Sequence, residues 1–219
     1  MERGSSYKPV VKICGLFRDE DIQAVNNAKP EYCGFIIDYP KSHRNVTPQK
    51  AYELKRGLRD GITPVGVFVN KPFMEVAEYL KFGVVDIAQL HGDEDESYID
   101  NLKAEVPDKE VWKVYKISPD MNEKEARAVL FNAERSLADM IVLDAGYGEG
   151  RPFDHTILKG FKRPYILAGG LRMEDLVKTL VFLEPYGIDI SSGVESKGFK
   201  DPAKIDQVIY VSKHIGEYI

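Results

Sequence analysis

Short apolar segments alternate with longer segments of helical periodicity along this chain of 219 residues. The apolar segments predict strands at residues 10–14, 32–37, 64–69, 84–90, 111–116, 139–144, 164–169 and 187–192. The segments between them carry apolar residues three or four positions apart and predict helices at 19–28, 48–58, 72–82, 95–105, 122–133, 173–183 and 201–215, with a weak candidate at 153–160. Because strands and helices alternate, we expect the strands to lie parallel in one sheet.

The number of these strand–helix units favours one architecture. Eight units in 219 residues fit a (β/α)8 TIM barrel, an α/β fold. The alternative is a doubly wound sheet, which more often has about five to seven strands. No linker, low-complexity tract or block of charge indicates a second domain. We therefore predict a single barrel domain over residues 1–219, with residues 1–8 as a flexible N-terminal leader.

Composition restricts the classes of partner. The formal net charge is −5, and no basic patch indicates binding to nucleic acid. No run approaches the ~18 apolar residues of a membrane span, and the first residues lack the apolar core of a signal peptide. We therefore expect a cytoplasmic protein that binds no membrane. The two cysteines, Cys14 and Cys33, form no disulfide framework, and Cys33 is expected to be a small core residue.

The ends of the predicted strands carry polar or small residues. TIM-barrel active sites lie at the carboxyl ends of the strands, in the loops that lead to the helices. The residues at these positions are Cys14, Asp38, Asn70, His91, Lys116, Asp144, Gly169, Gly170, Ser191, Ser192 and Gly193. This set predicts a polar and chemically reactive barrel mouth.

Side-chain alternation along the strands predicts which residues face into the barrel. In "VVKIC", Val11 and Ile13 share one face, which is expected to pack on the helices, so Lys12 and Cys14 face inward. By the same alternation, Asp189 in "GIDISS" faces inward. Charged groups inside a barrel are unfavourable unless they are paired or functional.

The last two strands end in glycine and serine. Glycine allows backbone N–H groups to approach a ligand closely, and a helix N-terminus adds partial positive charge. The loops after strands seven and eight are the common phosphate site of such barrels. Tight turns without a ligand are the alternative. The predicted phosphate contacts come mainly from Gly170, Ser192 and Gly193, with Gly169 and Ser191 beside them.

Three further segments have a functional and a structural interpretation. Asp144 precedes a glycine-rich loop and is either an acid at the barrel mouth or a cap for the next turn. In "DIAQLHGDEDE" the acidic run fits a helix start, and a metal site at His91 matches no strong motif, so we expect Gln89 and His91 to line the pocket. Arg44 is either a carboxylate clamp or a solvated surface residue.

The segments "VKICGL", "QLHGDE", "VLDA", "ILAGGL" and "GIDISSGVESKGFKD" stand in this order between Val10 and Ile205. Together they resemble the phosphoribosylanthranilate isomerase family of tryptophan biosynthesis. The resemblance implies an Amadori rearrangement of a phosphosugar substrate without metal or organic cofactor, by a monomer or homodimer. It places the general base on Cys14 and the general acid on Asp144. It also places the anthranilate part of the substrate near Arg44 and Asp189.

These roles fit the chemistry of the two residues. Opening the furanose needs a proton on the ring oxygen, and a base must then remove the C2 proton. With ordinary pKa values of about 3.9 for Asp and about 8.5 for Cys, both groups are in the wrong protonation state near neutral pH. A nearby cation lowers a thiol pKa. Our hypothesis is that Lys12 favours the Cys14 thiolate and that Gly15 leaves room for substrate beside it.

The chain departs from the family pattern at Phe17, where Thr is usual, and at His43, where Pro is usual. In the sixth loop, "GYGEG", Glu149 would repel a phosphate unless it points away or pairs with Arg151. The related aminoimidazole-carboxamide ribotide isomerases use aspartate where this chain has Cys14. A phosphopentose epimerase would need metal-binding histidines at its strand ends, and a non-catalytic phospho-ligand module would be expected to have lost the acid or the base.

Overall fold

The computed structural model describes residues 7–118, 120–146, 155–158 and 160–218. Eight parallel strands form a closed barrel, since β1 pairs with both β2 and β9 and each other strand pairs with its neighbours along the chain. The barrel strands are β1 (Val10–Cys14), β2 (Tyr32–Ile37), β4 (Thr63–Phe68), β5 (Ile87–Leu90), β6 (Glu110–Lys116), β7 (Met140–Asp144), β8 (Tyr165–Ala168) and β9 (Gly187–Ile190). The predicted TIM barrel is confirmed.

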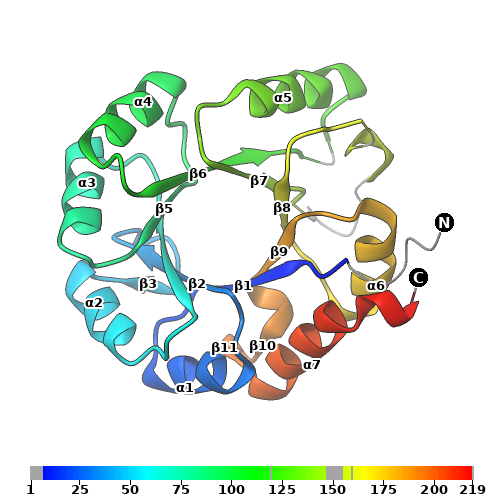
Figure 1. The fold of residues 1–219 in the computed structure, drawn as a ribbon, viewed down its shortest axis with the longest axis horizontal. Coiled ribbons are helices and arrows are strands. Elements are labelled where there is room, and N and C mark those ends of the chain that lie inside the picture. The colour runs from blue at the N-terminus through cyan, green and yellow to red at the C-terminus, as the bar shows by residue number, and fades with distance from the viewer. Residues whose placement is uncertain (1–6, 119, 147–154, 159, 219) are drawn as a thin grey trace.

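Helices surround the ring of strands (Figure 1). They are α1 (Asp19–Ala28), α2 (Pro48–Arg56), α3 (Phe73–Lys81), α4 (Glu96–Glu105), α5 (Glu123–Arg135), α6 (Met173–Leu183) and α7 (Pro202–Lys213). Side chains that accept a hydrogen bond from the first turn fix where several helices begin: Thr47, Asp95, Asn122 and Asp201. The predicted helix at 153–160 lies partly outside the described residues, which hold there a short 3-10 helix, η1 (His155–Leu158).

The structure differs from the predicted strands at several ends. β5 begins at Ile87 rather than at residue 84, because Val85 is fully buried in the loop and the Asp86 carboxylate pairs with Lys55. A buried loop residue has the same apolar signature as a strand residue. Three two-residue strands were not predicted: β3 (Asn45–Val46), β10 (Glu195–Ser196) and β11 (Phe199–Lys200). They are too short to show a periodicity.

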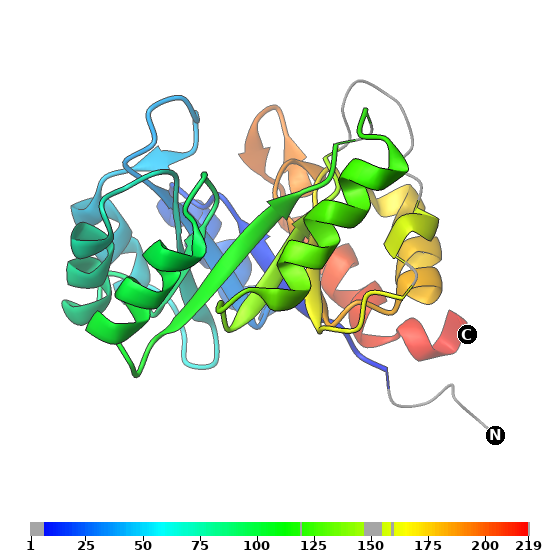
Figure 2. The ribbon, with the colours of Figure 1, turned by 90° about the horizontal axis from the view of Figure 1, so that it is seen from above.

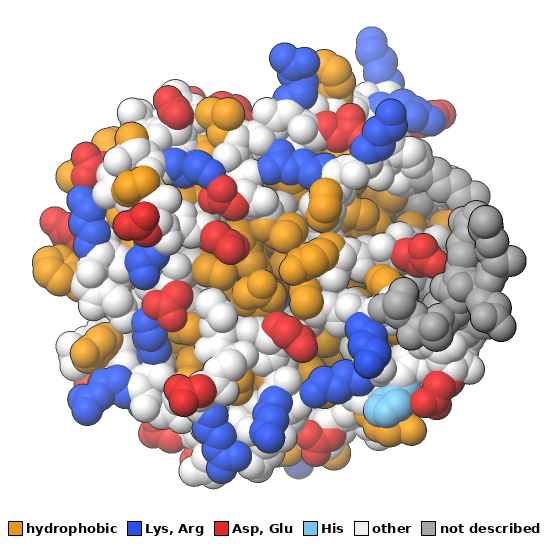
Figure 3. Space-filling model, in the orientation of Figure 1, with side chains coloured by type: hydrophobic (Ala, Val, Ile, Leu, Met, Phe, Trp, Pro, Cys, Tyr) orange, Lys and Arg blue, Asp and Glu red, His pale blue; other side chains and the backbone are white. Residues whose placement is uncertain are grey.

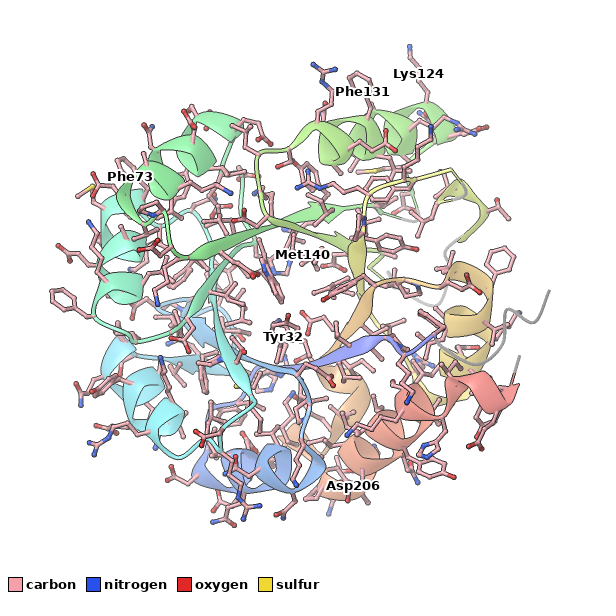
Figure 4. The ribbon with its side chains drawn as sticks, viewed as in Figure 1. Tyr32, Phe73, Lys124, Phe131, Met140 and Asp206 are labelled. Carbon is pink, nitrogen blue, oxygen red and sulfur yellow. The ribbon has the colours of Figure 1, made fainter. Side chains whose placement is uncertain are left out.

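The apolar core has two parts. The larger part lies between strands and helices and includes Val11 and Ile13, which confirms the alternation predicted for β1. The smaller part fills the barrel, around Trp112 and Val142, and Tyr32 and Met140 pack against it. Figure 4 shows the Tyr32 and Met140 side chains in the middle of the ring of strands.

The chain termini and the long loops after the strands lie at opposite ends of the barrel. In Figure 2 the chain termini lie at the lower side, and the β3 loop and the β10–β11 hairpin rise at the upper side. Hydrophobic side chains gather over the middle of the face shown in Figure 3, and charged side chains lie around it. None of the described helices is long and apolar enough to cross a membrane.

Candidate active site

A cavity of about 240 Å³ opens at the carboxyl ends of the barrel strands. It collects residues from the ends of most of the strands and from the loops that follow them. The predicted site residues that line it are Cys14, Arg44, Gln89, His91, Asp144, Gly169, Gly170, Asp189, Ser191, Ser192 and Gly193. The strand-end residues Asp38 and Asn70 do not line it, because Asp38 pairs with Lys71 and Asn70 bonds to Asp93.

Lys12 is the predicted site residue that does not line the cavity. Its side chain is fully buried inside the barrel, and Nζ lies 2.6 Å from Asp189 Oδ2. The two residues are register partners on β1 and β9. Gly34 on β2 keeps this region open, since a Cβ there would stand 2.6 Å from Cys14 Sγ and 3.1 Å from Lys12 Nζ. Lys12 therefore lies beneath the thiol and is separated from the cavity by residues that line it, among them Cys14 and Asp189.

Electrostatics around Cys14 qualify the thiolate hypothesis. Burial is the largest effect and raises the pKa of the Cys14 thiol, the Asp189 carboxylate raises it further, and Lys12 lowers it. The net pKa lies above the ordinary value, so Lys12 offsets the other two effects only in part. Burial alone would lower the pKa of Lys12, but Asp189 and Cys14 outweigh burial and keep the ammonium charged.

Two buried acceptors at the cavity wall lack a hydrogen-bond partner among the described residues. They are Gln89 Oε1 and Asp189 Oδ1, and both residues line the cavity. A buried oxygen without a partner is unfavourable by about 1–3 kcal/mol. A ligand that offers N–H or O–H groups removes this cost, so the wall is suited to a polar ligand with donors.

Asp144 stands at the end of β7 with His91 beside it. Asp144 Oδ2 lies 3.3 Å from His91 Nε2. A Cβ at residue 169 would be 2.3 Å from Asp144 Oδ1, and the φ of Gly169 is +91°, so only glycine fits at this position. The carboxyl group is thus confined by the backbone of the next loop on one side and an imidazole on the other.

The loop that carries His91 is held by a buried ion pair that sequence reasoning missed. Lys113 Nζ lies 2.9 Å from Glu94 Oε2, and both side chains are nearly inaccessible. Glu94 also accepts hydrogen bonds from the backbone N–H groups of Asn70 and Gly92. Part of the acidic run after β5 therefore organises the loop, while Asp95 caps α4 as expected. The sequence signal for this pair was Lys113, a charged residue in the middle of an apolar strand, β6.

Arg44 is held by a carboxylate of the β10–β11 hairpin. Its Nε and Nη2 donate to the two oxygens of Glu195 over 2.6 and 2.7 Å. Lys200 Nζ donates to the same carboxylate over 2.7 Å and to the Ser191 carbonyl over 3.0 Å. Burial raises the pKa of Glu195, but the Arg44 and Lys200 hydrogen bonds outweigh it and bring the pKa to about 2. Neither Glu195 nor Lys200 was predicted as a site residue.

Gly15 has a different role from the one expected. Its φ is +78°, and a Cβ at this position would stand 2.4 Å from Arg44 Cδ. The space beside Cys14 is therefore taken up by the Arg44 side chain. The expectation that Gly15 leaves room for substrate is corrected: the glycine lets Arg44 cross the β1–α1 loop.

The loops after β8 and β9, which hold the residues predicted for the phosphate, lie against each other. A Cβ at Gly193 would stand 2.2 Å from the Leu171 carbonyl oxygen, so the loops after β8 and β9 touch there. Phe17 and His43, where the chain departs from the family pattern, meet edge to face at 6.2 Å, and Phe17 also packs on Phe199. Most of the glycine-rich loop after β7, with Glu149, lies outside the described residues.

Proteins of known family are similar to this chain in sequence and in fold. A profile of the N-(5'-phosphoribosyl)anthranilate isomerase family matches residues 11–211. The isomerase of Caldanaerobacter subterraneus is 41% identical over 91% of this chain and 95% of its own length. That of Endomicrobium trichonymphae is 37% identical over 94% of this chain and 100% of its own length.

Solved structures agree with these relatives. Phosphoribosylanthranilate isomerase of Thermotoga maritima superposes with a TM-score of 0.81 and 28% identity, over 94% of this chain and 99% of that chain. A phosphoribosylanthranilate isomerase in complex with reduced 1-(o-carboxyphenylamino)-1-deoxyribulose 5-phosphate has a TM-score of 0.79 and 27% identity over the same shares. This chain, with a thiol and a carboxyl group facing one cavity at the mouth of its barrel, belongs to the N-(5'-phosphoribosyl)anthranilate isomerase family.

Proposed function

We propose that this chain isomerises N-(5'-phosphoribosyl)anthranilate to 1-(2-carboxyphenylamino)-1-deoxyribulose 5-phosphate in tryptophan biosynthesis, with Cys14 as base and Asp144 as acid. The observation that carries the proposal is one cavity lined by both groups and by the glycine and serine residues of a phosphate corner. The enzyme acts without metal or organic cofactor, in the cytoplasm, as a monomer or homodimer. Two solved structures of the family support the ligand class and the oligomeric states. One is a complex with reduced 1-(o-carboxyphenylamino)-1-deoxyribulose 5-phosphate, and the other shows generated monomers of the dimeric enzyme of Thermotoga maritima.

Asp144 delivers the first proton. Protonation of the furanose oxygen breaks the C1–O bond while the nitrogen lone pair forms a C=N⁺ bond, which gives an open-chain iminium. His91 Nε2, at 3.3 Å from the carboxyl group, holds this group in place for the transfer. Gly169 keeps the other carboxyl oxygen close to the backbone, so the acid has little freedom to turn away.

Cys14 removes the second proton. The C2–H electrons form a C1=C2 bond, the C=N⁺ electrons return to nitrogen, and the product is an enolamine that tautomerises to the ketone at C2. The base must lose its own proton first, and burial together with Asp189 opposes that loss. Lys12 is therefore a positioning residue in our proposal: it stabilises the thiolate from below and does not touch the substrate.

The remaining cavity residues bind the two ends of the substrate. Arg44 offers positive charge to the anthranilate carboxylate, since a guanidinium matches a carboxylate by paired hydrogen bonds. The unpartnered oxygens of Gln89 and Asp189 accept from substrate O–H or N–H groups. In this proposal the phosphate binds at the residues predicted for it, and their lining of the cavity supports this: Gly169, Gly170, Ser191, Ser192 and Gly193.

The test follows substrate fluorescence. The anthranilate fluorescence should fall as the wild-type protein consumes the substrate, and Cys14→Ala and Asp144→Asn should each slow the fall by at least about a hundredfold. Cys33→Ala removes the other thiol, which is fully buried in the outer core, and should keep the activity. Wild-type turnover that survives both Cys14→Ala and Asp144→Asn would remove the assignment.

A further inference from the structure

The two edges of the Arg44 guanidinium are used differently. A guanidinium has five N–H donors, which form one fork along Nε and Nη2 and a second along Nη1 and Nη2. Glu195 occupies the first fork with both of its oxygens. Among the described residues, no hydrogen bond from Arg44 Nη1 is found, and Arg44 lines the cavity. The second fork is therefore free to accept another carboxylate.

The charges around Arg44 also leave room for an anion. Two cations, Arg44 and Lys200, share the single carboxylate of Glu195, whose pKa of about 2 keeps it ionised. With Lys200 protonated, the group as a whole carries one positive charge in excess; burial lowers the pKa of Lys200, and Glu195 offsets this only in part. An incoming carboxylate would neutralise the group without breaking the contact between Arg44 and Glu195.

We propose that Glu195 is a positioning residue for substrate recognition: it clamps the Nε edge of Arg44 and thereby presents the other edge to the anthranilate carboxylate. The inference rests on the proposed function and deepens it. Arg44 is a long side chain on the β2–β3 connection, and several single bonds must be fixed before it can select one carboxylate geometry. Glu195 fixes them in the unliganded protein, and Gly15 allows the stem to lie flat against the β1–α1 loop.

The same clamp connects to the catalytic end of β1. Lys200 bonds to Glu195 and to the Ser191 carbonyl, and the Ser191 hydroxyl donates to the Cys14 carbonyl over 2.9 Å. The Lys200 side chain is fully inaccessible, and that of Glu195 is 6% exposed. A rigid, water-poor connection thus joins the carboxylate clamp to the backbone of the proposed base.

The experiment compares two substrates in four proteins. The substrates are N-(5'-phosphoribosyl)anthranilate and the corresponding aniline compound, which lacks the carboxylate, and product formation is followed by NMR. The proteins are the wild type, Glu195→Gln, Arg44→Ala and the double variant. Glu195→Gln should raise KM for the anthranilate substrate about tenfold, the effect of one charge-assisted hydrogen bond, with little change in kcat. Turnover of the aniline compound should fall less than that of the anthranilate substrate, so that the ratio of the two kcat/KM values, the preference for the carboxylate, decreases.

Two comparisons complete the design. In the Arg44→Ala background, Glu195→Gln should cause no further loss of preference for the anthranilate substrate, because the residues act as one unit. Glu195→Asp, which keeps the carboxylate, should recover part of the preference. Circular dichroism and a thermal melt establish that each variant is folded.

The outcomes separate the inference from the proposed function. A wild-type protein without turnover of either substrate contradicts the proposed function. A folded Glu195→Gln variant with an unchanged preference, or with a lower KM for the anthranilate substrate, contradicts the inference alone. A lower KM would mean that Glu195 competes with the substrate for Arg44.

Discussion

Lys12 is a lysine without solvent access inside the barrel, below the cavity that Cys14 and Asp189 line. Removing one partner of a buried ion pair is strongly destabilising, typically by about 3–5 kcal/mol, because the other charge is left without a partner. The ammonium of Lys12 faces the Asp189 carboxylate and the Cys14 sulfur, and both hold its pKa above the ordinary value. The balance among these three groups therefore decides how much thiolate is present.

Lys12→Met should raise the pKa of Cys14 further above its ordinary value. The positive charge that favours the thiolate disappears, while burial and Asp189, which disfavour it, remain. The alkaline shift is measured from the pH dependence of alkylation at Cys14, followed by mass spectrometry, and from the pH profile of kcat/KM.

Cys33 provides the internal reference for this measurement. It is fully buried, so its alkylation would report unfolding rather than a changed pKa at the active site. If Cys33 stays protected and the Cys14 titration coincides with that of the wild type, Lys12 does not tune the thiol.

At the scale of elements, three connecting segments contact one another at one side of the site. The β1–α1 loop, the β3 segment and the β10–β11 hairpin meet through Arg44 and Glu195 on the inside and through Phe17, His43 and Phe199 on the outside. Two of the departures from the family pattern, Phe17 and His43, lie in the outer contact. They touch each other, and the ion pair of Arg44 and Glu195 is present beside them.

Gly15→Ala should both destabilise the protein and weaken substrate binding. A left-handed residue with a side chain costs about 1–2 kcal/mol, and the new Cβ would also displace the Arg44 stem. We expect a raised KM for the anthranilate substrate, measured by steady-state kinetics, together with a lower free energy of unfolding in urea.

Gly61→Ala is the matched control. Gly61 has a φ of +92°, but a Cβ there would meet nothing within 4 Å. This variant should show the loss of stability without the rise in KM. Equal KM values in the two variants would mean that the approach of Arg44 to Gly15 has no role in binding.

Most of the helices and strands could be predicted from the sequence, because both have a recognisable pattern of apolar residues. Buried parallel strands are continuous apolar runs, and the helices between them show a clear period, so the barrel and the strand-end positions of Cys14 and Asp144 followed. The partners of the site residues could not be predicted in the same way. Glu195 lies 151 residues from Arg44, in a hairpin whose strands have two residues each, and no local pattern connects them.

At the scale of the whole molecule, ion pairs tie the first part of the chain to the last. Lys12 and Asp189 join β1 to β9, and Arg44 and Glu195 join the β2–β3 connection to the β10–β11 hairpin. These contacts lie across the seam where the barrel closes. Protonation of Glu195 should therefore weaken the closed barrel.

Acid should reduce stability through Glu195 in a defined range. Its pKa falls from an ordinary 4.5 to about 2 on folding, so its contribution is present above pH 4.5 and is lost as the pH falls towards 2. In guanidinium melts at stepwise lower pH, the free energy of unfolding of the wild type should fall more steeply than that of Glu195→Gln.

Glu123→Gln, on the exposed face of α5, controls for the change in net charge. It removes one carboxylate without touching the seam and should retain the steep wild-type slope. A Glu195→Gln variant with the same slope as the wild type would show that acid acts elsewhere in the molecule.

The pairing of β1 with β9 also has a consequence for biosynthesis. Lys12 emerges from the ribosome 177 residues before its partner Asp189. At about 5–20 residues per second, the lysine waits about 9 to 35 s for its counter-charge. During translation the first strand thus carries a lysine and a thiol on the face that will later be inside. The nascent chain can complete neither the barrel nor the active site until β9 has been made.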